Sequence, residues 1–211
     1  LEKFGRASLA YLELTKPASM ALLVFTCLAS LVVARQGHAP ARLMLTAFAA
    51  ITAGCAGANA TTCYLDRDID AIMTRTQRRP LPTGRIRPPQ RALHFVLGLM
   101  LMALALAGSL NFLTSLLMLL GLLDNVIIYS LLTKRRSRWN VLWGSISGGL
   151  PAALGWSAAT GTLNLTAVLT DGDLVLWIPN HIWNLAIFHA EDYRRVRVPM
   201  LPVVYELKKV L

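Results

Sequence analysis

The 211-residue sequence has few charged side chains. Only 15% of its residues are Asp, Glu, Lys or Arg, whereas 55% are hydrophobic. A soluble globular domain carries about 25% charged residues, so this composition is typical of a protein that crosses a membrane several times. Acidic residues are particularly scarce, 11 against 21 basic ones. The basic residues are confined to short gaps between apolar runs, which argues against nucleic-acid binding and favours membrane orientation and an anionic ligand.

Cysteine is also rare. The three cysteines, Cys27, Cys55 and Cys63, all fall in apolar segments, and no two of them have CxxC spacing. This pattern supports neither a disulfide framework nor a zinc site. We therefore expect reduced thiols that pack inside the protein.

Long apolar runs dominate the chain. We predict one all-α domain over residues 1–211, a polytopic transmembrane helix bundle with about six spans. An amphipathic segment at residues 1–16 has the composition of a helix on the membrane surface and ends before Pro17. Asp171 and Asp173 interrupt the last run, where a buried carboxylate is costly, so they lie near the outer surface or line a cavity. The predicted spans are residues 18–34, 41–65, 92–107, 112–132, 139–158 and 163–190.

The basic residues predict the orientation of the bundle. If the N-terminus lies in the cytoplasm, 19 of the 21 Lys and Arg residues lie on the inner side, and only Arg35 and Arg42 lie outside. The positive-inside rule therefore predicts a multi-pass protein of the cell (inner) membrane, with its candidate site facing the cytoplasm.

The candidate site is centred on the end of the second span. Asp66 and Asp70 are four residues apart, so a helix places them on one face, and Thr62 and Asn59 continue this stripe. Asp68 points elsewhere. Two neighbouring carboxylates repel each other unless a cation lies between them, and oxygen ligands suit Mg²⁺ shared with phosphate. We interpret the stripe as a metal–diphosphate site.

A basic loop follows the aspartates. Guanidinium groups pair with phosphate oxygens through two hydrogen bonds, so these arginines suit the remaining oxygens of a diphosphate. The alternative is a solvated loop whose charges only set the membrane orientation. The seven arginines that follow the aspartates or lie between them are Arg67, Arg75, Arg78, Arg79, Arg85, Arg87 and Arg91.

The run YLDRDIDAIMTRTQRRPLPTGRI resembles the first aspartate-rich motif of the intramembrane UbiA-type prenyltransferases. Its DRDID and RPLPTGRI parts are similar to the protoheme IX farnesyltransferase (heme O synthase) branch of that family. That branch reads Asn-x-x-x-Asp-x-x-x-Asp, and this sequence has Thr62 in place of the asparagine. Either the Thr62 hydroxyl or Asn59, one turn earlier, takes that position in the site.

A second run, WIPNHIWNLAIFHAEDYRRVRVPMLPVV, is similar to another signature of the same branch. The resemblance implies that Asp192 is a third metal ligand and that Tyr193 belongs to the substrate site. It also implies that His181 contacts porphyrin or its iron, although a packing role for this histidine is the alternative.

The run YSLLTKRRSRWN resembles the Tyr and Lys-Arg element of the family. The resemblance implies that Lys134 and Arg135 bind substrate, Lys134 at the diphosphate, and that Tyr129 forms the cavity wall. Orientation charges alone are the alternative for Lys134.

The resemblance implies transfer of a farnesyl group from farnesyl diphosphate to the 2-vinyl group of haem b. It implies Mg²⁺ held by Asp66, Asp70 and Asp192, with Arg75, Arg79 and Lys134 around the diphosphate. Heme A synthase or a terminal oxidase assembly are candidate partners, besides the lipid bilayer. Alternatives are a UbiA-type enzyme for a quinone precursor or chlorophyllide, and a non-catalytic haem-binding protein or transporter. The family continues for roughly three more spans, so we expect the domain to be incomplete at its C-terminus.

Overall fold

The computed structural model describes residues 2–205, with side chains from residue 7 onward, and within this range every regular element is helical. The prediction of an all-α bundle is confirmed. The helices are α1 (Glu2–Leu14), α2 (Pro17–Ala34), α3 (Ala41–Leu65), α4 (Arg67–Asp70), α5 (Gln90–Leu110), α6 (Phe112–Leu123), η1 (Asp124–Thr133), α7 (Asn140–Gly149), α8 (Pro151–Thr160), α9 (Leu165–Phe188), α10 (Ala190–Arg195) and α11 (Leu201–Val204).

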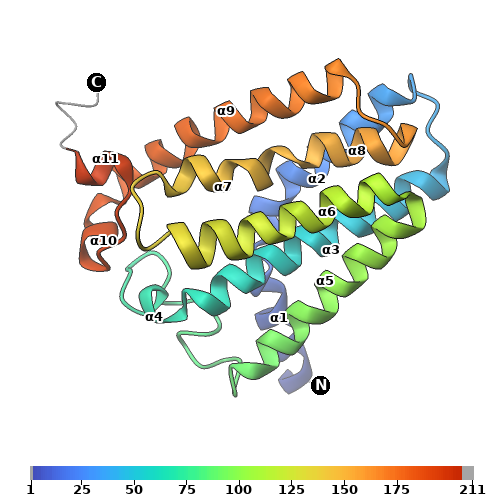
Figure 1. Ribbon diagram of the computed structural model, residues 1–211. Helices are drawn as coiled ribbons and strands as arrows, with labels where there is room; N and C mark the ends of the chain where they lie inside the picture. The colour runs from blue at the N-terminus through green and yellow to red at the C-terminus, as the bar shows by residue number, and fades with distance from the viewer. Residues whose placement is uncertain (1, 206–211) are drawn as a thin grey trace.

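Four helical segments in the described range are long and apolar enough to cross a membrane: α2, α3, α5 and the continuous α6–η1 segment. The other two predicted spans lie alongside them as the α7–α8 pair and α9 (Figure 1). The fifth run is divided because Pro151 cannot continue the hydrogen-bond ladder of α7, so α8 starts at this proline. In α9, two aspartates and two asparagines lower the hydropathy of the helix.

The joint between α5 and α6 is tighter than predicted. The sequence suggested a four-residue turn at 108–111, but α5 continues to Leu110 and leaves Asn111 as the single connecting residue. Asn111 has an extended backbone, and its side-chain oxygen accepts a hydrogen bond from the Thr114 N–H at 2.8 Å. This N-cap satisfies a backbone donor that would otherwise lack a partner in lipid, which is why one residue suffices.

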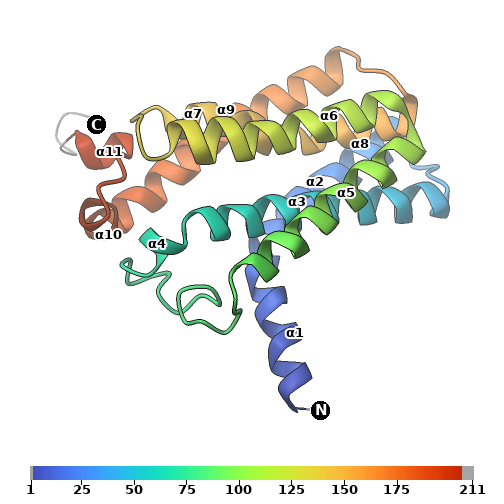
Figure 2. The same ribbon diagram turned by 60° about the horizontal axis from the view of Figure 1, so that its bottom comes forward.

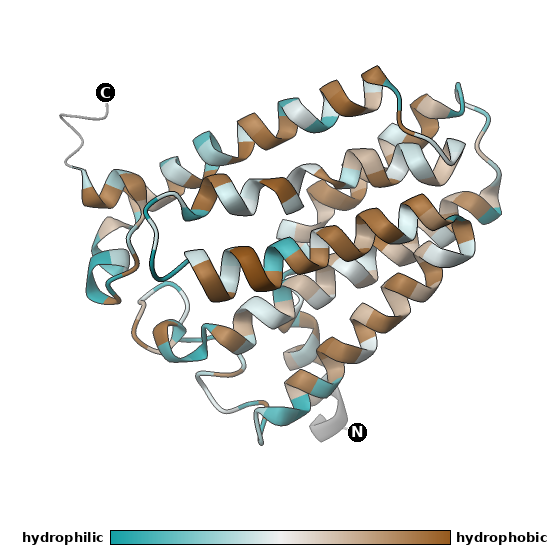
Figure 3. Ribbon diagram, in the orientation of Figure 1, coloured by the Kyte–Doolittle hydropathy of each residue, from teal (hydrophilic) through white to brown (hydrophobic). Residues whose placement is uncertain are grey.

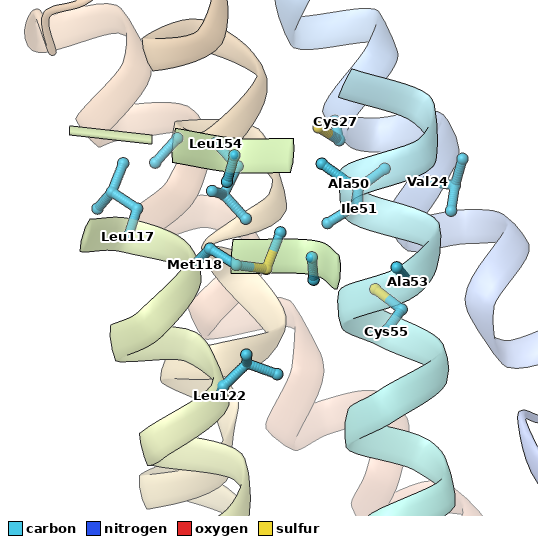
Figure 4. Close-up of a cluster of buried hydrophobic side chains, with 13 residues drawn as sticks. Val24, Cys27, Ala50, Ile51, Ala53, Cys55, Leu117, Met118, Leu122 and Leu154 are labelled. Carbon is cyan, nitrogen blue, oxygen red and sulfur yellow. The ribbon is translucent and has the colours of Figure 1, made fainter. Parts of the chain in front are cut away.

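Small side chains hold the core of the bundle together. Figure 4 shows side chains of α3 and α6 pointing toward each other, with Val24 and Cys27 of α2 beside them. A Cβ atom added at Gly155 would overlap the carbonyl oxygen of Cys27, so α8 touches the α2 backbone directly. Such close approach is typical of membrane helices. All three cysteines are buried and free, as predicted.

Two carboxylates face the region where α7 gives way to α8. Asp124 is buried, and its Oδ2 accepts a hydrogen bond from the Ser147 N–H of α7 at 2.9 Å. Asp171 of α9 faces the Ala153 N–H in the first turn of α8. The interrupted helices thus offer backbone donors that stabilise polar groups within the bundle. Asp173, by contrast, is exposed.

The polar loops gather at one end of the bundle. In Figure 1, α4, the loop after it, the η1–α7 connection, α10 and α11 all lie at the left, and Figure 3 shows this end to be the more hydrophilic one. Helix α1 projects away from the bundle, as Figure 2 shows after rotation. The residues predicted for the site come mainly from elements that meet at this end.

Candidate active site

A chamber of about 340 Å³ lies at the polar end of the bundle. Its walls come from the α1–α2 corner, α3, α4 and the following loop, η1, α9 and α10. Eight of the residues predicted for the site line this chamber: Asn59, Thr62, Asp70, Arg75, Arg79, Tyr129, Lys134 and Tyr193.

Asp66 and Asp70 lie one helical turn apart, as their spacing predicts. Helix α3 bends at Asp66, but the backbone hydrogen bond from Asp70 N to Asp66 O, 2.8 Å long, keeps the helical path continuous into α4. Both carboxylates are buried, 2% and 4% exposed. Asp68 points away and forms two hydrogen bonds to the guanidinium of Arg135, which lower its pKa.

Each buried carboxylate has its own cation. Arg79 Nη1 lies 2.9 and 2.7 Å from the two oxygens of Asp70. Lys134 forms an ion pair with Oδ2 of Asp66. Burial on its own lowers the pKa of Lys134, but the nearby Tyr129 and Asp66 oxygens outweigh this effect and raise it above its usual value. The pairs compensate for the cost of burying charge, and Lys134 stays protonated at neutral pH.

The second oxygen of Asp66, Oδ1, takes no part in the ion pair with Lys134. It is buried and accepts no hydrogen bond from the described residues, although Arg135 Nη2 lies 3.6 Å away. A buried carboxylate oxygen without a donor is costly unless a further cation or donor reaches it. The site therefore has unused capacity for a cation at this atom.

A π-helix explains how two side chains of η1 and that of Lys134, the residue directly after it, reach the chamber. Asn125 and Lys134 are nine residues apart, about two and a half turns of an α-helix, which would place them on opposite faces. The wider i→i+5 turn of a π-helix brings Asn125, Tyr129 and Lys134 to one face. Its hydrogen-bond pattern is seen at Lys134 N, which donates to Tyr129 O at 2.8 Å. All three residues line the chamber.

Asp192 lies on α10 and does not line the chamber. Its two oxygens accept hydrogen bonds from the backbone N–H groups of Thr74 and Arg75, at 3.0 and 3.1 Å. Burial would raise the pKa of Asp192, but these two bonds outweigh burial and hold it below its usual value. Between residues 7 and 205, no three His, Cys, Asp or Glu side chains are grouped closely enough to hold one ion. The structure thus brings Asp66 and Asp70 together, without Asp192.

The structure also leaves His181 outside the chamber. This side chain is exposed and stacks on Trp177 of the same helix, with ring centroids 4.8 Å apart. His189, two helical turns further along the chain, lines the chamber instead. Arg135 does not line the chamber either; it is exposed and bound to Asp68.

Four polar residues in the chamber wall were not predicted from the sequence: Lys16, Ser19, Asn125 and His189. The position of Lys16 in the sequence could have indicated its place in the site, because a lysine directly before the first span lies at the same membrane face as the aspartates. Asn125 could have been identified as well, because the polar pair Asp124–Asn125 interrupts an apolar run.

An apolar cavity of about 150 Å³ adjoins the chamber inside the bundle. Leu23, Met118 and Leu154 are among its walls, and Asn59 and Asn125 line both spaces. The site therefore combines a cationic chamber with a neighbouring space for apolar groups. This arrangement can bind an anionic head group together with a hydrocarbon tail.

These features define an integral membrane helix bundle with a site for an amphipathic anion. Solved structures share the fold. A UbiA homologue from Archaeoglobus fulgidus, bound to DMAPP and Mg²⁺, has a TM-score of 0.78 at 17% identity, over 94% of this chain and 70% of that one. A structure of digeranylgeranylglyceryl phosphate synthase has a TM-score of 0.79 at 20% identity, over 100% and 72%.

Sequence comparison gives the family. The model of the UbiA prenyltransferase family matches residues 23–211, and the chain belongs to this family. It is 52% identical over 209 residues to the protoheme IX farnesyltransferase of Desulforudis audaxviator, covering 99% of this chain and 66% of the relative. Its identity to the enzyme of the same name from Thermoplasma volcanium is 45% over 196 residues, covering 90% and 67%. The chain spans about two thirds of the length of these relatives.

Proposed function

We propose that the chain carries the chemistry of a protoheme IX farnesyltransferase, in which farnesyl diphosphate is the donor and haem b the acceptor. The observation that carries this proposal is a pair of buried carboxylates with cations, Asp70 with Arg79 and Asp66 with Lys134. Asp70, Arg79 and Lys134 line the chamber, Asp66 lies behind Lys134 outside the lining, and the chamber adjoins an apolar cavity. Relatives of this name at 52% and 45% identity support the choice of donor and acceptor.

Mg²⁺ is the proposed metal, and the residues fit it. Asp66 and Asp70 supply hard oxygen ligands, and the unpartnered Oδ1 of Asp66 has capacity for a cation. Asp192 is the third proposed ligand, because its oxygens keep lone pairs beyond the two backbone hydrogen bonds. The structural neighbour bound to DMAPP and Mg²⁺ supports this assignment. Bound Mg²⁺ would neutralise charge on the leaving diphosphate.

The chain's own residues then bind and orient the donor. Arg75, Arg79 and Lys134 hold phosphate oxygens, so the diphosphate leaves with the electron pair of its bond to C1 of the farnesyl group. The apolar cavity holds the hydrocarbon chain and limits access of water to the reactive carbon. A vinyl carbon of the acceptor forms the new bond to C1. Water adds to the other vinyl carbon and loses a proton, which gives the hydroxyethylfarnesyl product.

The acceptor side uses the remaining residues. Tyr129 and Tyr193 form the wall of the chamber, and we propose Arg135, bound to Asp68 outside the lining, as a contact for the acceptor. Thr62 and Asn59 also line the chamber, but they continue the stripe of Asp66 and Asp70 and belong to the donor side. His181 as a porphyrin contact is a proposal that rests on the resemblance alone. The excess of Lys and Arg at this end supports a cytoplasmic site in the cell membrane.

A conversion assay tests the proposal. Membranes containing the chain are incubated with haem b, farnesyl diphosphate and Mg²⁺, and the haems are analysed by mass spectrometry. We expect haem O from the wild type and from Asp173→Ala, an exposed acidic control, but none from Asp66→Ala or Asp70→Ala. Wild-type conversion by either site variant would refute the assignment. Diphosphate release with a quinone precursor but not with haem would identify a different acceptor.

A further inference from the structure

The corner between α1 and α2 places one residue in an unfavourable backbone conformation. Lys16 has φ 54° and ψ 65°, in the left-handed region that side chains other than glycine rarely adopt. Such a conformation persists where the surrounding structure holds it, and it is common at functional sites. Contacts with the rest of the protein must therefore hold Lys16 in this conformation.

Side chains of α3 hold this corner in place. Asn59 Nδ2 donates a hydrogen bond to the carbonyl of Thr15 at 3.0 Å. One helical turn later, Cys63 Sγ lies 3.7 Å from the carbonyl oxygen of Leu14 and donates to it. Helix α3 thus fixes the two peptide groups directly before Lys16.

The Lys16 side chain lines the chamber together with Arg79 and Lys134. Arg79 is paired with Asp70 and Lys134 with Asp66, whereas Lys16 has no ion pair to any residue between 7 and 205. Burial is the main influence on the ammonium and lowers its pKa, and the nearby Arg79 and Lys134 act in the same direction. Cations held together without a matching number of carboxylates favour binding of a multivalent anion.

We propose that Lys16 binds the diphosphate of the prenyl donor and that Asn59 is its positioning residue. Asn59 acts through the α1–α2 corner, because its amide nitrogen holds the Thr15 carbonyl. The inference rests on the proposed function and deepens it. The diphosphate is favoured over a carboxylate of the acceptor because two cations of the chamber wall, Lys16 and Arg75, have no carboxylate partner among the described residues. One carboxylate would match only one of these two charges.

The test is equilibrium binding of farnesyl thiodiphosphate, an unreactive donor analogue, to the purified chain in lipid nanodiscs with Mg²⁺. We expect Lys16→Gln to weaken binding at least about tenfold and Lys16→Arg to restore most of it, because a second charged donor still reaches phosphate. Arg42→Gln, at the opposite end of the bundle, is the matched control and binds like the wild type. Thermal unfolding of each variant is recorded alongside.

Asn59 is tested by non-additivity. Asn59→Ala should weaken binding of the analogue, and Lys16→Gln combined with Asn59→Ala should bind no more weakly than Lys16→Gln alone. Additive losses would show that Asn59 contacts the ligand independently and would overturn its positioning role. In turnover, Lys16→Gln should raise the KM for the donor and leave the KM for haem unchanged.

Other outcomes overturn the inference in distinguishable ways. If the wild type binds the analogue and Lys16→Gln binds it equally well, the role of Lys16 is refuted while the proposed function stands. If Lys16→Gln weakens the binding of haem but not of the donor analogue, Lys16 binds a carboxylate of the acceptor and its role at the diphosphate is refuted. If the wild type binds no analogue, the proposed function itself fails, and the role of Lys16 fails with it.

Discussion

Asp192 on α10 accepts a hydrogen bond from the backbone N–H of Thr74, which lies 118 positions earlier in the chain. A second bond, from the N–H of Arg75, occupies the other oxygen of the carboxylate. This single side chain therefore fixes the start of the basic loop that contributes Arg75 and Arg79 to the chamber. Asp192 therefore contributes to the site through this loop.

Replacement of Asp192 by alanine should release the loop. Two backbone N–H groups lose a charged acceptor, and each such bond is worth about 1.5–3 kcal/mol. We expect limited trypsin digestion to cut after Arg75 or Arg78 several times faster in Asp192→Ala than in the wild type. Glu191→Gln is the control, since Glu191 is exposed and its carboxylate lies 4.0 Å from Arg195. Equal cleavage rates in the two variants would contradict this role.

The Asp66–Lys134 pair predicts a separation of stability from activity. Lys134→Met should destabilise the protein by about 3–5 kcal/mol, because it leaves a buried carboxylate without its cation. Adding Asp66→Asn to this variant removes the unpaired charge and should recover most of the thermal stability. Activity should stay absent in the double variant. Additive destabilisation in a double-mutant cycle would show that the two residues do not interact in the native state.

Much of this architecture is predictable because it depends on local patterns. Apolar run lengths placed α2, α3, α5, α6–η1 and α9 within a few residues of their observed positions. The four-residue spacing of Asp66 and Asp70 placed them on one face, since a helix repeats nearly every four residues. The break in the fifth run lies at Pro151, where a local rule explains it, because proline removes a backbone donor.

The remaining features depend on contacts that leave no local signal. The run DNVIIYSLLT suits an α-helix or a π-helix equally, so its sequence does not show that Lys134 shares a face with Asn125. Asp192 accepts its hydrogen bonds from backbone N–H groups, which every residue except proline has. The corner that places Lys16 at the chamber is held by the hydrogen bond from Asn59 to the Thr15 carbonyl, and these two residues are 44 positions apart. These relationships require the tertiary structure.

The ion pair between Glu13 and Arg85 should make stability depend on pH. It joins α1 to the basic loop, with a hydrogen bond of 2.8 Å, and this bond lowers the pKa of Glu13. A lowered carboxyl pKa means that the contribution is present above the unfolded value, about 4.3, and is lost as the pH falls through the folded value. Both side chains are 39% exposed, so the pair is worth at most about 1 kcal/mol.

This dependence is measured as the difference in unfolding free energy between the wild type and Glu13→Gln across a pH series. The difference should be largest near pH 7 and should shrink as the pH falls below the unfolded value and through the lowered folded value, because the wild-type carboxyl then becomes protonated. Added salt should reduce the difference at neutral pH. A difference that does not change with pH would exclude the pair as its source.

Glycine packing between α2 and α8 gives a prediction that does not involve the site. A methyl group at Gly155 would overlap the backbone carbonyl of Cys27, and a backbone atom cannot rotate away as a side chain can. The two helices must separate, so Gly155→Ala should cost about 1–3 kcal/mol or more, although alanine has the higher helix propensity. Gly172→Ala in α9 is the matched control, because no atom lies within 4 Å of its added Cβ, and it should leave stability unchanged or raise it slightly. Thermal unfolding in one detergent compares the two variants, and a Gly155→Ala protein as stable as Gly172→Ala would show that the α2–α8 contact is not as close as the structure places it.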